Sequence, residues 1–137
     1  GGSLATDRGG QLHLAWFTNS AANQGLFYKR IAGNWESPPM PIGNPGAQAN
    51  HASVTTEGKT VLIVWREFDG QSYSVQMMHS NDGGASWGEP QRLMESPGAT
   101  DYPVPLISAG KVLIVWNTAK EGLRILPMER VVARRAG

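Results

Sequence analysis

The most informative stretch of this chain is one polar segment with a carboxylate and hydroxyl groups, Ser80-Asn81-Asp82-Gly83-Gly84-Ala85-Ser86-Trp87. A carboxylate beside hydroxyl groups could take part in acid–base catalysis. The two glycines, however, permit positive φ at a tight turn, and a short Asp side chain before them accepts backbone N–H bonds across it. Ser80 can brace the same loop, and the Trp87 indole can pack beside it. We therefore expect Asp82 to be a structural residue of a hairpin and not a catalytic acid.

The strands that position this segment belong to a repeat. Three apolar runs resemble one another, at residues 12–17, 61–66 and 112–117, and each contains one tryptophan. Trp16, Trp65 and Trp116 are 49 and 51 residues apart (65 − 16 and 116 − 65). His51 lies 14 residues before Trp65, and Tyr102 lies 14 before Trp116 (65 − 51 and 116 − 102). A period of this length is typical of propellers and other repeat architectures.

Each repeat is predicted to contain short strands joined by turns. The run 61–65 is apolar at every position, as expected for a strand covered on both faces. The predicted strands are 3–6, 11–18, 25–31 and 35–42 in the first repeat, 51–56, 60–66, 73–79 and 89–94 in the second, and 102–108, 111–116 and 123–132 in the third. The third repeat therefore lacks a fourth strand. We predict an all-β chain of antiparallel sheets, with repeats at about 1–46, 47–97 and 98–137.

Composition excludes several classes of function. The net charge of +1 gives no reason to expect a nucleic-acid surface, and no run approaches the roughly 20 apolar residues of a membrane helix. Three scattered histidines and no cysteine predict neither a metal site nor a disulfide framework, and no cofactor motif is present. The chain begins Gly-Gly-Ser without a visible signal peptide, so we expect that an upstream part is missing.

The form S-x-D-G-G-x-x-W resembles the Asp-box, or BNR repeat, of sialidases (neuraminidases) and related β-propellers. In that family the box is a structural staple between the outer strands of a blade. The resemblance gives this role to Ser80, Asp82, Gly83, Gly84 and Trp87. It implies antiparallel four-stranded blades, about three of them, and it favours a secreted or periplasmic protein. The first repeat keeps only Gly33-Asn34-Trp35 of the box, and the third repeat keeps none.

The resemblance also implies candidate site residues, because sialidase-like propellers place the active site on the face opposite the boxes. His51, Asp101 and Tyr102 correspond to starts of inner strands, and Arg66 and Glu67 to a loop after a second strand.

Sialidases hold the substrate carboxylate with three arginines and use a tyrosine–glutamate pair as nucleophile. Tyr102 is then the candidate nucleophile with Glu67 as its base, and Asp101 is a further catalytic candidate. Arg66, Arg124 and His51 are the candidate substrate-binding residues. The family's catalytic aspartate and first arginine belong to an N-terminal half, so one copy of this chain does not supply a complete site.

Each of these residues also has a structural interpretation. Tyr102 precedes Pro103 and could simply pack at a strand start, and Arg66 and Glu67 could form a solvated strand end. The leading hypothesis is the C-terminal half of a glycan-acting propeller; if it is an enzyme, it is an exo-sialidase-like glycoside hydrolase. The alternative is a non-catalytic module that binds glycan or protein, or that self-associates into a six-bladed ring. The expected partners are a carbohydrate such as a sialoside, and either the remaining propeller half or a second identical chain.

Overall fold

The computed structural model describes residues 2–20, 23–44 and 46–128. Across these ranges the chain forms twelve β-strands and no helix, and all strand pairs are antiparallel. The described residues accordingly include no helix long and apolar enough to cross a membrane. The predicted all-β class with antiparallel sheets is confirmed.

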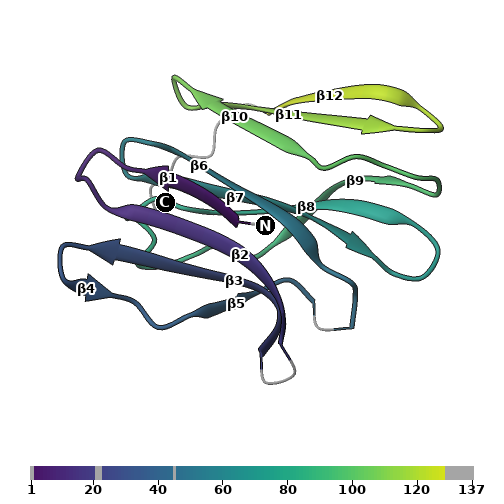
Figure 1. Ribbon diagram of the computed structural model, residues 1–137. Coiled ribbons are helices and arrows are strands. Elements are labelled where there is room, and N and C mark those ends of the chain that lie inside the picture. The colour runs from purple at the N-terminus through teal and green to yellow at the C-terminus, as the bar shows by residue number, and fades with distance from the viewer. Residues whose placement is uncertain (1, 21–22, 45, 129–137) are drawn as a thin grey trace.

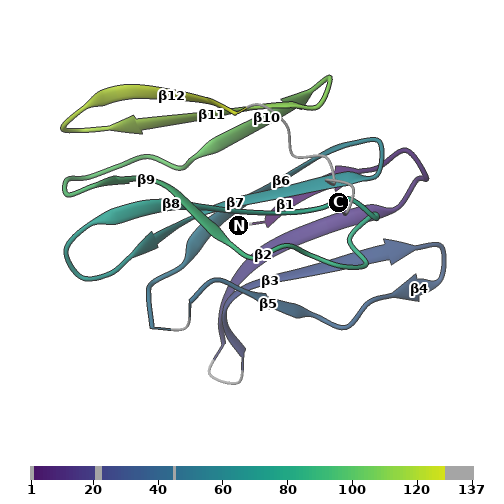
Figure 2. The ribbon, with the colours of Figure 1, turned by 180° about the vertical axis from the view of Figure 1, so that it is seen from behind.

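The strands form three sheets that follow one another along the chain (Figures 1 and 2). Sheet 1 contains β1 (Gly2–Thr6), β2 (Leu12–Ser20), β3 (Asn23–Ala32), β4 (Trp35–Glu36) and β5 (Met40–Ile42). Sheet 2 contains β6 (Asn50–Glu57), β7 (Thr60–Phe68), β8 (Tyr73–Ser80) and β9 (Gln91–Ser96). Sheet 3 contains β10 (Val104–Ser108), β11 (Lys111–Thr118) and β12 (Gly122–Met128).

The predicted strands match the observed ones in order and position, with two differences. The run expected at 35–42 is split into β4 and β5, which both pair with β3. Pro38 and Pro39 lie between them, and proline has no N–H to contribute to a sheet. The expected end of the last strand at residue 132 lies outside the described residues.

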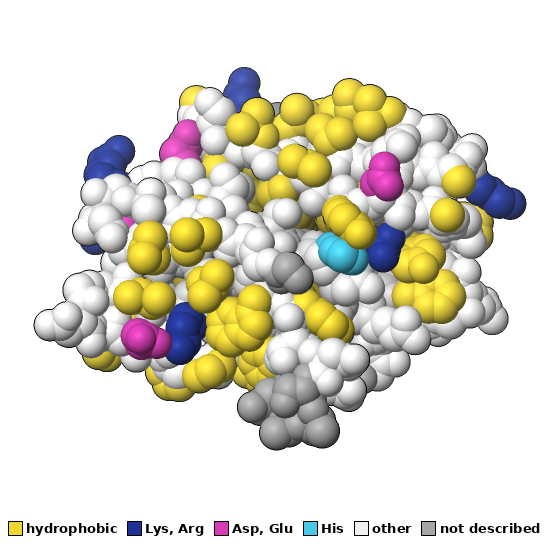
Figure 3. Space-filling model, in the orientation of Figure 1, with side chains coloured by type: hydrophobic (Ala, Val, Ile, Leu, Met, Phe, Trp, Pro, Cys, Tyr) yellow, Lys and Arg dark blue, Asp and Glu magenta, His cyan; other side chains and the backbone are white. Residues whose placement is uncertain are grey.

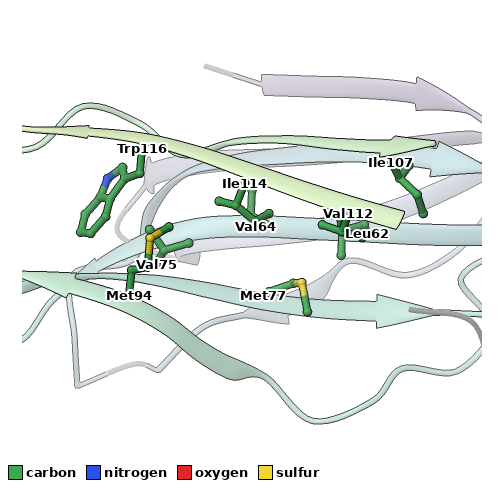
Figure 4. Close-up of a cluster of buried hydrophobic side chains, with 9 residues drawn as sticks. All are labelled: Leu62, Val64, Val75, Met77, Met94, Ile107, Val112, Ile114 and Trp116. Atoms are coloured by element: carbon green, nitrogen blue, oxygen red, sulfur yellow. The ribbon is translucent and has the colours of Figure 1, made fainter. Parts of the chain in front are cut away.

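The sheets stack face to face, and two apolar cores fill the space between them. The first core joins sheets 1 and 2 and includes Leu26, Tyr28, Ile63 and the fully buried Trp65. The second core joins sheets 2 and 3, and Figure 4 shows its side chains. The first strands of the three sheets lie side by side, with β6 in contact with both β1 and β10. Sheet 2 is therefore covered on both faces, as the apolar run 61–65 indicates.

The hairpin after β8 is held by its own polar side chains. The Ser80 hydroxyl donates to Asp82 Oδ1 at 2.7 Å and accepts from the Gly84 N–H at 2.9 Å. Asp82 accepts from both the N–H and the hydroxyl of Ser86, and the Trp87 indole donates to the Gly84 carbonyl at 3.2 Å. Gly83 and Gly84 have φ of 69° and 89°, which glycine adopts without strain. Both carboxylate oxygens of Asp82 are thus engaged inside the turn.

The same hairpin is anchored on sheet 1. The Tyr28 ring meets the Trp87 ring edge-on at 4.9 Å, and its hydroxyl shares a 2.7 Å hydrogen bond with His13. The other ring nitrogen of His13 lies 2.8 Å from Asp7 Oδ2, so a buried polar chain runs beneath the hairpin. Burial raises the pKa of Tyr28 well above its usual value, which keeps the phenol protonated.

The hairpin bonds predict a specific pH dependence. The bonds from Ser86 and Ser80 lower the pKa of Asp82 to about 2, against about 3.9 in an unfolded chain. Ionised Asp82 therefore stabilises the fold above about pH 4, and that contribution is lost as the pH falls from about 4 to 2. The stability difference between wild type and Asp82→Asn should shrink across this window, measured by urea unfolding at several pH values.

Asp101→Asn, which removes an exposed carboxylate outside the hairpin, is the matched control for this measurement. A constant difference between wild type and Asp82→Asn from pH 5 to 2 would contradict the assignment.

Candidate functional site

The candidate residues lie at the end of sheet 2 opposite the hairpin. The pairing of β7 with β8 runs from Val61 and Ser80 at the hairpin end to Phe68 and Tyr73 at the other end. Strand β6 begins at that second end, where Asn50 pairs with Arg66. His51 and Arg66 are therefore brought together by adjacent antiparallel strands.

His51 and Tyr102 form an exposed aromatic pair. Their ring centroids are 3.5 Å apart with an interplanar angle of 18°, and Tyr102 is 54% exposed. His51 has a φ of 56°, and the ladder between β6 and β7 shifts register between Asn50 and Ser53. A left-handed conformation is uncommon for a residue other than glycine, and such residues cluster at functional sites. The bulge sets His51 apart from the regular strand and against Tyr102.

Arg66 holds the segment before β10 against sheet 2. Its Nη1 donates to the Thr100 carbonyl at 2.7 Å and lies 3.2 Å from the Thr100 hydroxyl. Its Nε donates to Asn50 Oδ1 at 3.2 Å. The guanidinium carbon lies 4.4 Å from the centroid of the Tyr73 ring and 5.4 Å from that of Tyr102, within the range of cation–π attraction. Arg66 therefore places a fixed positive charge beside the aromatic pair.

A cavity of about 410 Å³ opens at this pair. Its lining includes Phe17, Asn50, His51, Ser53 and Tyr102, and none of the described residues that line it is acidic. A second hollow of about 710 Å³ shares Phe17 and Asn50 with the first and continues along residues 43–44 and 47–49. In Figure 3 a histidine side chain, in cyan, lies next to a hydrophobic and a basic side chain. Burial and the nearby Arg66 charge both lower the pKa of His51, which favours a neutral imidazole at pH 7.

Searches of protein-family models and of curated proteins find no match to this chain.

The carboxylate of Glu67 is engaged by residues other than Tyr102. Its side chain is buried, with the residue 7% exposed, and Oε2 accepts from the Trp65 indole at 2.8 Å and from the Asn44 N–H at 3.0 Å. Among the described residues, no hydrogen bond joins Glu67 to Tyr102. The carboxylate instead ties the segment after β5 to the core tryptophan of sheet 2.

The remaining two candidates also have structural partners. Asp101 accepts from the Asn117 amide at 3.2 Å, and its carbonyl accepts from the Trp116 indole at 2.9 Å. Arg124 donates to the Glu95 carbonyl at 2.8 Å and lies 5.7 Å from the Trp116 ring centroid. The contacts of Arg124 and those of Arg66 have no residue in common. The structure thus gathers His51, Tyr102 and Arg66, but it does not join Glu67 or Arg124 to them.

Four residues of the site were missing from the sequence-based candidates: Phe17, Asn50, Tyr73 and Thr100. Phe17 directly follows Trp16 in the repeated run, and Asn50 directly precedes His51. The sequence signal for Phe17 and Asn50 was that each is adjacent to a residue already recognised as a repeat position. Within the described ranges, no group of three or more His, Asp or Glu side chains is arranged to hold a metal ion.

Proposed function

We propose that this chain is a segment of an Asp-box β-propeller, in which each sheet is a blade, and that it binds carbohydrate at the His51–Tyr102 cavity. The observation that carries the proposal is the exposed, stacked aromatic pair at the rim of a concave site. The apolar C–H face of a sugar ring packs on such a surface, while nearby polar groups fix its orientation. Asn50 and Ser53 supply polar groups in the same lining.

The charge at the site favours an acidic sugar. Arg66 lies under the Tyr102 ring, and the described lining contains no carboxylate to oppose it. Arg66 is not part of the lining, but its nearby positive charge attracts a carboxylate more strongly than an uncharged hydroxyl group. A sialoside is therefore the proposed ligand in preference to a neutral glycan of similar size.

We propose binding, and not hydrolysis by a single copy, because the carboxylate expected to activate Tyr102 is used elsewhere. Glu67 is held by Trp65 and Asn44, and Tyr102 stacks on His51. A chain that supplies one part of a larger glycan-acting site fits this arrangement, and so does a purely binding module.

Calorimetric titration with sialyllactose and with lactose tests the proposal. Tyr102→Ala should weaken sialyllactose binding about tenfold, equivalent to about 1.4 kcal/mol, since it removes the stacking surface. Trp35→Ala, which removes a 48% exposed aromatic residue outside the cavity lining, should leave binding unchanged.

Three results would overturn this proposal. If Tyr102→Ala and Trp35→Ala lost binding equally, or if the wild type did not bind, the cavity would not be a glycan-binding site. Turnover of a fluorogenic sialoside by the wild type, abolished in Tyr102→Phe, would instead establish catalysis with Tyr102 as nucleophile.

A further inference from the structure

The interface between sheets 1 and 2 and the interface between sheets 2 and 3 are built from equivalent faces of the sheets. In each sheet, one face carries the tryptophan of the second strand and is called here the Trp face. The other is called the opposite face. Between sheets 1 and 2, the opposite face of sheet 1 (Ala15, Leu26, Tyr28) packs on the Trp face of sheet 2 (Ile63, Trp65, Met78). Between sheets 2 and 3, the opposite face of sheet 2 (Val64, Val75, Met77) packs on the Trp face of sheet 3 (Val112, Ile114, Trp116).

The strand registers show that these positions are equivalent from sheet to sheet. Ala15 pairs with Tyr28, Val64 pairs with Met77, and Val115 pairs with Ile125. Ile125 of sheet 3 is therefore the counterpart of Met77 and Tyr28, both of which are buried in interfaces. By the same comparison Leu4, which pairs with Leu14, corresponds to Val54, which pairs with Ile63.

Two faces of these same kinds have no covering sheet among the described residues. On the Trp face of sheet 1, Leu4 is 62% exposed and Trp16 is only partly buried, whereas Trp65 and Trp116 are fully buried. On the opposite face of sheet 3, Leu123 is 62% and Ile125 is 57% exposed, and β10 adds two more apolar side chains. Figure 3 shows hydrophobic side chains gathered over sheet 3. Contiguous apolar surfaces of this kind mark interaction sites.

We propose that a second copy of this chain covers both faces, with the Trp face of sheet 1 in each copy packed on the opposite face of sheet 3 in the other. The two open faces continue the pattern of the internal interfaces, because each lacks, within the described residues, the partner sheet that its counterparts have. One second copy supplies both missing faces at once. Two copies of three sheets give six, which lies within the 4 to 8 blades of closed propellers. The closed pair also removes the exposed apolar surface from water.

Light scattering of the purified chain over a range of concentrations tests this proposal. The expected mass is twice that of the 14.8 kDa chain. Leu4→Glu and Ile125→Glu should each yield monomers, because a charge buried in the interface without a partner is costly. Both side chains are mostly exposed within one copy, so circular dichroism should show an intact fold. Trp35→Glu, which changes an exposed apolar residue on neither of the two faces, should remain dimeric.

Mixing the two monomeric variants distinguishes this arrangement from a symmetric contact. In the mixture, the intact Trp face of Ile125→Glu can meet the intact opposite face of Leu4→Glu, so a mixed dimer should form. A dimer that is broken by only one of the variants would show like faces in contact and would overturn the proposal. A wild type that is monomeric at every concentration would also overturn it, with the faces then covered by further sheets of a longer polypeptide. Filaments would rule out closure. None of these results depends on glycan binding.

Discussion

Trp65→Ala is expected to lower the free energy of unfolding by about 3–5 kcal/mol, the usual cost of deleting a large buried aromatic side chain. Trp65 is fully buried between sheets 1 and 2, where collapse around the cavity is restricted by two packed sheets. The substitution also removes the indole N–H that donates to buried Glu67, which leaves a carboxylate with one fewer partner. Urea denaturation followed by circular dichroism measures the effect.

Two further variants separate the contributions to this loss. Trp65→Phe keeps much of the apolar volume but lacks the donor, so its loss of stability reports mainly on Glu67. Trp35→Ala deletes a tryptophan that is 48% exposed and should cost far less. If Trp65→Ala proved as stable as Trp35→Ala, sheets 1 and 2 would not be packed as described.

Gly84→Ala is expected to be the next most disruptive change, with a loss of about 3 kcal/mol or more from overpacking and backbone strain together. A Cβ at this position would collide with the Tyr28 hydroxyl, and the φ of 89° disfavours any side chain. The Tyr28 ring cannot withdraw easily, because His13 and Trp87 contact it. Thermal unfolding of wild type and variant gives the comparison.

Gly58→Ala is the matched control, since its φ is 61° but a Cβ there meets nothing within 4 Å. It should cost only the backbone strain, about 1–2 kcal/mol. Removing the obstructing hydroxyl in Gly84→Ala/Tyr28→Phe should recover part of the loss, even though His13 then loses one of its two hydrogen-bond partners. No recovery in the double variant, together with equal losses at Gly58 and Gly84, would contradict the steric explanation.

The fold was predictable because its signals are local and repeated. The apolar runs that contain Trp16, Trp65 and Trp116 recur in phase, and each forms the second strand of a sheet. The turn at the hairpin requires positive φ at two positions. The glycine pair that provides it can be recognised in one sequence without an alignment. The prediction of one strand over 35–42 is wrong at Pro38 and Pro39, because proline lacks the N–H group that a continuous strand needs.

The site was less predictable, because side-chain partners depend on neighbours distant in sequence. The spacing before Trp65 and Trp116 marks His51 and Tyr102 as equivalent repeat positions, and the resemblance to sialidase-like propellers made them site candidates. The structure stacks these two rings. Nothing local indicated that Glu67 would turn to the Trp65 indole, since that depends on the segment around Asn44 closing over it. Likewise, the position of Arg66 between Tyr73 and Tyr102 follows from the packing of sheet 3 on sheet 2.

The anchoring of the hairpin on Tyr28 has a consequence for modularity. The turn of the second repeat completes its structure on a side chain of the first, through Gly84 against Tyr28 and the Gly83 carbonyl bound by Arg30. Contacts that stabilise the turn therefore cross the boundary between the two repeats. Duplication or excision of one repeat would separate a turn from its support, so a viable unit of rearrangement must carry a turn together with the preceding sheet.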